Sequence, residues 1–173
     1  EIVVPYSGEN NNYADALTTF GVNIVSNTYA DGKGVIEFDG DVTIIGDAAF
    51  WDCDNIKNII LPNSITTIGG VSFFDCDSLE VITIPESVTT IGSANYYGGG
   101  QTFTSCDNLR EFRGKFATED GRCLIIDNVL TCFAAAGLTE YVIPHSVTTI
   151  GNLAFNGCSS LTSVTIPDSV TTI

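Results

Sequence analysis

Few residues in this chain could carry chemistry, and most of them recur at a regular spacing. The chain has 173 residues, with six cysteines and a single histidine, His145. A nucleophile needs a base of suitable pKa beside it, but His145 shares its position after a proline with Asn63, Glu86 and Asp168. We interpret that position as solvent-exposed, and we predict that the chain is not an enzyme and has no catalytic residue.

Four of the cysteines form a column whose spacing differs from that of zinc sites. Cys53 and Cys76 are 23 residues apart, whereas zinc-binding cysteines are usually separated by about two to four residues. Cys106 and Cys158 continue the column. Side chains stacked in a column point in parallel, so we predict reduced, buried thiols that act as small apolar residues.

Cys123 and Cys132 are the exception among the cysteines. They flank Asp127-Asn128, a pair typical of a two-residue hairpin turn. A turn there would place the two cysteines opposite each other, so a cross-strand disulfide stays open as an alternative to two thiols.

Carboxylates lie beside the cysteine column at Asp52, Asp54, Asp75, Asp77 and Asp107. Calcium accepts several such oxygens. However, serine and glycine interrupt these columns at Ser105, Gly157 and Ser159, and no D-x-D-x-D loop is present. We interpret the aspartates as solvated or turn-forming, and we predict no metal site and no cofactor.

The basic residues are clustered. Four of the six, Arg110, Arg113, Lys115 and Arg122, lie within one short stretch. A partner that carries carboxylate or sulfate groups could bind them. The alternative, which we favour, is that they pair with nearby carboxylates at Glu80, Glu111, Glu119 or Asp120.

A seven-residue insertion contains Tyr96 and Tyr97, followed by three glycines. Paired tyrosines beside glycine are typical of adaptable binding loops. The alternative is a tolerated insertion without a function, because a longer loop costs little entropy.

These residues belong to an internal repeat that covers most of the chain. Its template is I-P-x-S-V-T-x-I-G-x-x-A-F-x-x-C-x-x-L-x-x-V-x-I, and its prolines recur 23 residues apart, as at Pro62 and Pro85. The same phenylalanine position is filled in four copies, at Phe50, Phe73, Phe103 and Phe155. Several columns in step are the signature of a repeat architecture.

Each repeat predicts one coil of a solenoid. Leu-x-x-Val-x-Ile and Ser-Val-Thr-x-Ile predict two short strands, and proline ends the first of them. Ala-Phe-x-x-Cys predicts one helical or 3-10 turn. A single repeat cannot bury its apolar columns, but stacked copies can. The expected fold is therefore an α/β, β-rich, right-handed solenoid of the leucine-rich-repeat type, with 23-residue repeats and short helical or 3-10 turns.

The repeat divides the chain into two parts. Residues 1–41 lack the template and are expected to form an N-terminal cap, with strands over 22–25 and 35–38 joined as a hairpin. Residues 42–173 are the repeats, with a variant hairpin rung at about 116–143 and a truncated C-terminal rung. The chain starts at Glu1 and has no Met, so we expect that a leader was removed. We also expect that further chain or another subunit covers the last rung.

The charge of the chain excludes two classes of partner. It has 6 basic and 21 acidic residues, for a net charge of −15, and such a surface repels nucleic acid and anionic membranes. It has no apolar run of 18 residues, so this segment is not expected to insert into a membrane.

The motifs Ile-Pro-x-Ser-Val-Thr-x-Ile-Gly and Ala-Phe-x-x-Cys-x-x-Leu resemble the BspA-like leucine-rich repeat family of bacterial cell-surface proteins, roughly over residues 42–173. The resemblance implies an extracellular, non-catalytic adhesion or protein-binding module. It also implies host extracellular-matrix or plasma proteins, such as fibronectin and fibrinogen, as partners. The alternatives are a glycan-binding domain, with Tyr96, Tyr97 and Trp51 as stacking residues, or a structural spacer.

Ligand contacts are expected at variable strand positions, where leucine-rich repeats present side chains, and at the basic cluster and the insertion. The predicted ligand-binding residues are Tyr96, Tyr97, Arg110, Arg113, Lys115, Arg122, Glu80, Thr83 and Thr165.

Overall fold

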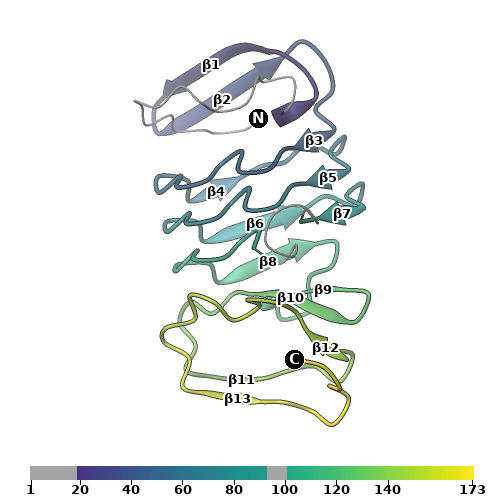
Figure 1. Ribbon diagram of the computed structural model, residues 1–173. Coiled ribbons are helices and arrows are strands. Elements are labelled where there is room, and N and C mark those ends of the chain that lie inside the picture. Colours follow the sequence, from purple (N-terminus) through teal and green to yellow (C-terminus); the bar gives the residue numbers. More distant parts are fainter. Residues whose placement is uncertain (1–18, 93–100) are drawn as a thin grey trace.

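The computed structural model describes residues 19–92 and 101–173. They form a β-solenoid of about five coils, whose strands are stacked from a hairpin at the N-terminal end to β11 (Glu140–Val142) and β13 (Ser163–Thr165) at the other end (Figure 1). The repeated residues that the sequence analysis grouped into columns therefore stack, one coil upon the next.

The first ladder of parallel strands comes from the Ser-Val-Thr-x-Ile segments. It contains β3 (Ile44–Ile45), β5 (Thr67–Ile68) and β7 (Thr90–Ile91), in that order. The pairing places Ile45, Ile68 and Ile91 side by side. Ile45 and Ile68 are fully buried, because alternation along a strand turns every second residue inward.

The second ladder comes from the Leu-x-x-Val-x-Ile segments. It contains β4 (Asn58–Ile59), β6 (Val81–Ile84) and β8 (Glu111–Gly114). Ile59, Ile82 and Phe112 are paired in register and point into the core. The parallel register between β6 and β8 is kept although the insertion lies between them in the sequence.

The stretch expected to be a helical or 3-10 turn is not helical, and the α/β class is wrong. Within the described part of the chain, helical backbone occurs only at Thr19 and Phe20. The physical reason is that each copy of Ala-Phe-x-x-Cys has a left-handed residue directly before its cysteine, such as Asp52 (φ 59°) or Asp75 (φ 60°), and a right-handed helix excludes this conformation. The corner is a series of turns instead.

Stacked rings fill the inside of these corners. The ring centroids of Phe50 and Phe73 are 5.0 Å apart, and those of Phe73 and Phe103 are 5.4 Å apart. Phe155 packs at a tilt on Phe133, with ring centroids 5.0 Å apart, rather than on Phe103. Phe133 belongs to the variant rung, so that rung supplies its own ring to the column.

Side-chain hydroxyls link each coil to the one before it. Ser64 donates to the carbonyl oxygen of Val42 at 2.7 Å, and Thr66 donates to that of Thr43 at 3.2 Å. The same bonds recur one coil later, from Ser87 to Ile65 and from Thr89 to Thr66. Hydrogen bonds between coils thus explain the threonine column and the serines at 64 and 87, whereas the buried hydroxyl of Ser169 in the last coil has no partner among the described residues.

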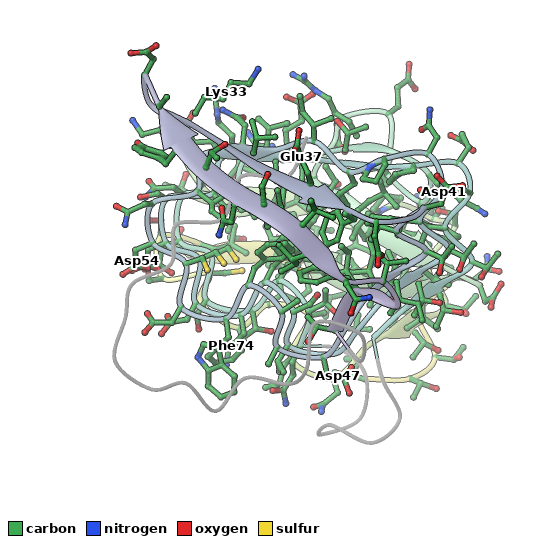
Figure 2. All side chains as sticks on the ribbon, turned by 90° about the horizontal axis from the view of Figure 1, so that it is seen from above. Lys33, Glu37, Asp41, Asp47, Asp54 and Phe74 are labelled. Atoms are coloured by element: carbon green, nitrogen blue, oxygen red, sulfur yellow. The ribbon has the colours of Figure 1, made fainter. Side chains whose placement is uncertain are left out.

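A hairpin lies over the first coil. β1 (Ile24–Ala30) pairs antiparallel with β2 (Lys33–Phe38) through a two-residue turn at Asp31 and Gly32, both with positive φ. The first strand begins later and is longer than the expected 22–25. Ile36 is buried in the core cluster, and Figure 2 shows the hairpin crossing the end of the stack.

The variant rung carries the second hairpin. β9 (Cys123–Ile126) and β10 (Val129–Phe133) turn at Asp127 (φ 49°) and Asn128 (φ 64°), as predicted. β10 also pairs in parallel with β12 (Thr149–Ile150), whereas β11 pairs with β13. Neither ladder above runs on into these strands, so the stacking is interrupted after β8.

The six cysteines are free thiols. Cys123 and Cys132 do not lie opposite each other, which corrects the expectation for this pair. A bulge between Leu130 and Cys132 shifts the register, so Cys132 faces Leu124 and Cys123 faces Phe133. One extra residue in a strand is enough to separate two otherwise matched positions.

Candidate functional site

The outward side of the second ladder forms a flat array of side chains, which we call the outer face. Its members are Lys57, Asn58, Ile60, Glu80, Val81, Thr83, Arg110, Glu111 and Arg113. Alternation turns Asn58, Val81, Thr83, Glu111 and Arg113 outward along the strands, whereas Ile59, Ile82 and Phe112 point inward. Lys57, Glu80 and Arg110 immediately precede the three strands, and none of them is buried. The face therefore follows directly from the template, in which the apolar positions are constant and the outward ones vary.

Two ion pairs lie on the outer face, one between coils and one within β8. A guanidinium nitrogen of Arg110 lies 2.8 Å from a Glu80 carboxylate oxygen on the neighbouring coil. Arg113 donates two hydrogen bonds to Glu111, at 2.7 and 2.8 Å, and these bonds hold the pKa of Glu111 below its usual value. All four side chains stay well exposed, so these pairs leave the charged groups accessible to a partner.

Lys115 and Arg122 are bonded to the backbone. The Lys115 ammonium group donates to the carbonyl oxygens of Glu86 and Val88 and lies 5.2 Å from the ring centroid of Phe116. Arg122 Nη1 donates to the carbonyl oxygens of Ala134 and Ala136, each at 3.0 Å. Lys115 thus links two coils, and Arg122 links the start of β9 to the chain that follows β10, which distinguishes both from Arg110 and Arg113.

The other predicted ligand-binding residues are dispersed. Thr83 pairs with Arg113 on the outer face, but Thr165 lies on β13, opposite Val142 in a separate sheet. Tyr96 and Tyr97 lie outside the described residues. The structure thus brings together four of the predicted set: Glu80, Thr83, Arg110 and Arg113.

A polar network that the sequence analysis missed lies where the stacking is interrupted. The Tyr141 hydroxyl donates to Asp120 at 2.9 Å and lies 3.4 Å from the sulfur of Cys123. Burial raises the pKa of Tyr141, and Cys123 and Asp120 add to the shift. The available signal was the tyrosine at position 141, the one residue with a hydroxyl in a column that otherwise holds Ile59, Ile82, Phe112 and Val164.

Asp120 is the acceptor at the centre of this network. Burial acts to raise its pKa, but hydrogen bonds from the Thr118 hydroxyl, the Arg122 backbone N–H and the Tyr141 hydroxyl lower it on balance. The carboxylate is therefore ionised and well satisfied at neutral pH.

A hollow of about 420 Å³ opens beside this network, and we call it the junction hollow. Its walls are Thr118, Glu119, Asp120, Tyr141, Val142 and Pro144. Val142 is 64 % exposed, so an apolar side chain is available next to carboxylates. This combination suits a ligand that is both apolar and cationic.

The aspartates beside the cysteine column form an acidic corner. Partial burial and the charges of Asp77, Asp52, Asp54 and Asp107 raise the pKa of Asp75. No group of three or more metal-binding side chains occurs in residues 19–92 and 101–173. Positive φ at Asp52 and Asp75 explains part of the column, because aspartate tolerates this conformation better than most residues.

The thiols of the cysteine column gather beside Asp54, where Figure 2 shows the sulfur atoms in yellow. Cys76 and Cys106 donate to the carbonyl oxygens of Phe50 and Phe73 in the coil before, each at 3.0 Å. Burial raises the pKa of Cys53 to about 12 and that of Cys158 to about 11. Protonated thiols of this kind are poor nucleophiles.

No helix in the described ranges is long and apolar enough to cross a membrane. His145 is exposed, as expected from its column.

Comparison with known proteins places this geometry in context. The family model for the BspA type leucine rich repeat region matches in six copies, over residues 22–116 and 129–173. A search of curated proteins finds no match.

Two solved structures are similar to this chain. A leucine-rich cell surface protein from Faecalibacterium prausnitzii is 28 % identical, with a TM-score of 0.64 over 76 % of this chain and 35 % of its own. A leucine-rich repeat protein from Bacteroides ovatus is also 28 % identical, with a TM-score of 0.50 over 98 % of this chain and 41 % of its own. The chain thus spans well under half the length of either relative.

Proposed function

This chain belongs to the BspA-type leucine-rich repeat family, and from that premise we propose that it is a non-catalytic protein-binding module of a bacterial cell-surface protein. The similar structure from Faecalibacterium prausnitzii is described as a cell surface protein, which supports this location. The proposal includes adhesion as the biological role.

The outer face is the observation that carries the proposal. It presents outward residues from three coils in register, with Arg110, Arg113, Glu80 and Glu111 all accessible. A solenoid makes such a surface without any further element, because each coil adds one row of variable side chains to a rigid frame. Exposed charges that are paired only at the surface exchange partners at little cost.

Host matrix or plasma proteins of the fibronectin and fibrinogen type are the proposed partners, as the family resemblance implies. The acidic chain, with a net charge of −15, favours a partner whose contacting surface is basic overall. Arg110 and Arg113 are exceptions on the outer face, and they would contact carboxylates of the partner.

Surface-immobilised fibronectin and fibrinogen, titrated with the chain, test this proposal. Arg110→Ala should weaken binding about three- to tenfold, because it removes an accessible guanidinium from the face. Lys33→Ala on the N-terminal hairpin is the matched control, since it also removes one positive charge. Equal effects of the two variants would count against the outer face as the binding surface.

Glycan binding is the second candidate function, and one described residue favours it. Trp51 is 42 % exposed and packs on Phe74 with ring centroids 5.3 Å apart. A held, exposed indole is a suitable platform for a sugar ring. A glycan array probed with the wild type and Trp51→Ala tests this function, and silence in both assays would favour the structural spacer.

The proposal also includes the division of the chain into an N-terminal cap and a repeat region. Residues 1–41 are proposed to form the N-terminal cap, because Ile36 and Phe20 join the core that the first coil would otherwise expose; the family model begins to match at residue 22. Connections between parallel strands of one sheet are right-handed in about 98 % of cases, which supports the expected right-handed winding.

A further inference from the structure

Among the strands that the structure describes, none pairs with one of the two edges of β11. Its other edge pairs with β13, through bonds from Ser163 N–H to Thr139 and from Ile143 N–H to Thr165. In a parallel pair these bonds use the backbone of every second residue. The backbone N–H and C=O groups of Glu140 and Val142 therefore point the opposite way, and no described strand pairs with them.

The interrupted stacking explains why this edge is open. In the upper coils the edge of each strand is covered by the next one, as β6 covers β4. Between β8 and β11 the chain instead forms the segment 117–121, whose Gly121 carbonyl accepts from the Phe112 N–H at 2.7 Å. That segment bonds to β8, whereas no described strand pairs with the corresponding edge of β11.

The junction hollow lies along the same edge. Thr118, Glu119 and Asp120 form one wall, and Tyr141, Val142 and Pro144 form the other. Its volume of about 420 Å³ is within the usual range for ligand pockets. The hollow therefore offers room for side chains directly beside unpaired backbone groups.

The charges around the hollow select the occupant. Glu119 and Glu140 are exposed, and neither carboxylate is bonded to a side chain in the described ranges. Asp120 adds a third negative charge, held ionised by its hydrogen bonds. Arg122, two residues after Asp120, is bonded to the carbonyl oxygens of Ala134 and Ala136. A lysine or arginine can lay its aliphatic stem on Val142 and direct its charge to these carboxylates.

We propose that an extended, lysine- or arginine-bearing segment of a partner protein adds to the open edge of β11 as a further strand. Backbone hydrogen bonds to Glu140 and Val142 hold the segment, and the hollow takes its apolar and basic side chains. This inference rests on the proposed protein-binding function and deepens it, by naming a second surface and the chemistry of the partner.

A short peptide of alternating lysine and valine, acetylated and amidated, is the probe. Binding to the whole chain is followed by isothermal titration calorimetry at low salt. Methylating one backbone nitrogen of the peptide that faces β11 should weaken binding at least tenfold, because strand addition needs that N–H. An otherwise identical peptide with glutamate in place of lysine should not bind.

Variants of Val142 test the edge itself. Val142→Pro removes the N–H that points away from β13, and proline is tolerated on an edge strand when its nitrogen faces solvent. This variant should lose binding at least tenfold, whereas Val142→Ala keeps the N–H and should lose no more than about threefold. Circular dichroism and a melting curve show whether each variant is folded.

A second pair of variants leaves the backbone unchanged. The double variant Glu119→Gln, Glu140→Gln should bind the peptide about three- to tenfold more weakly than the wild type at low salt. This difference from the wild type should shrink at high salt. Arg110→Ala on the outer face should leave peptide binding unchanged. If the lysine–valine peptide fails to bind, or binds equally well to Val142→Pro, the strand-addition proposal is wrong.

The outcome for this edge is separable from the outcome for the outer face. If the peptide does not bind but matrix proteins still bind in an Arg110-dependent way, only the proposal for the β11 edge is rejected. If neither the peptide nor the matrix proteins bind, the protein-binding function is rejected as well.

Discussion

The thiol of Cys76 donates a hydrogen bond to the carbonyl oxygen of Phe50 in the preceding coil, at an Sγ–O distance of 3.0 Å. Both residues are fully buried. The same relationship recurs between Cys106 and Phe73. The cysteine column therefore supplies hydrogen-bond donors to backbone carbonyls at the corners, which lie outside the strand ladders.

Cys76→Ala should destabilise the chain by about 1–3 kcal/mol, because it leaves the buried Phe50 carbonyl without its thiol donor. Cys76→Ser should cost less than Cys76→Ala, since a hydroxyl can make the same bond. Cys53→Ala is the control, because the Cys53 thiol is only half-buried. Urea unfolding of the three variants measures the differences, and equal costs for all three would refute the donor role.

Phe73→Ala should cost about 3–5 kcal/mol, because it opens a cavity between Phe50 and Phe103, on which the Phe73 ring is stacked. The neighbouring Phe74 is only half-buried and packs on Trp51 at the surface. Phe74→Ala should therefore cost less than half as much. Comparison of denaturant midpoints checks this order, and a reversed order would show that the stacked rings are not the main core.

Asp75→Asn should stabilise the chain at neutral pH. Burial and four neighbouring aspartates raise the pKa of Asp75 in the folded state. A carboxyl whose folded pKa is raised favours folding below its unfolded value of 3.8, and that contribution is lost as the pH rises through the folded value. Asparagine removes the resulting penalty and tolerates the left-handed backbone at this position.

The expected gain for Asp75→Asn is about 0.2–0.5 kcal/mol at pH 7, because exposed charges are strongly screened. It should vanish below about pH 4 and shrink in 1 M salt. Asp168→Asn, at an exposed position away from the acidic corner, is the control. Melting temperatures across pH check the effect, and a gain that does not depend on pH would contradict the electrostatic explanation.

Tyr141→Phe should destabilise the chain by about 1–2 kcal/mol at neutral pH, because it removes the hydroxyl that donates to ionised Asp120. The folded pKa of Asp120 is lowered, so its contribution is present above the unfolded value of 3.8 and is lost as the pH falls through the folded value. The cost of Tyr141→Phe should therefore fall at acidic pH. Chemical unfolding at pH 7 and at pH 3 provides the measurement, and an unchanged cost would exclude Asp120 as the acceptor that matters.

The repeated columns were sufficient to predict the stacking of the coils and both ladders of strands. Ile45, Ile68 and Ile91 recur 23 residues apart and are side by side in the structure. Asp127-Asn128 correctly predicted the tight turn of the variant rung. The outward residues of the second ladder, including Arg110 and Arg113, also followed from the template.

The corner conformation was predicted wrongly, although a signal for it was present. Asp52, Asp75, Ser105 and Gly157 share one position, and all four have positive φ. Aspartate and glycine are among the residues that tolerate this conformation. The recurrence of these residues indicates a left-handed turn position rather than an incomplete column of calcium ligands.

The sequence by itself determined what is periodic in this protein, because a residue that recurs in every coil meets its own copies whatever the detailed path of the chain. Only the tertiary structure decided what happens where the period fails. A single bulged residue separates Cys132 from Cys123, Tyr141 reaches across to Asp120, and β11 keeps an open edge. These features depend on how two unlike segments meet in space, and no spacing between identical residues encodes that contact.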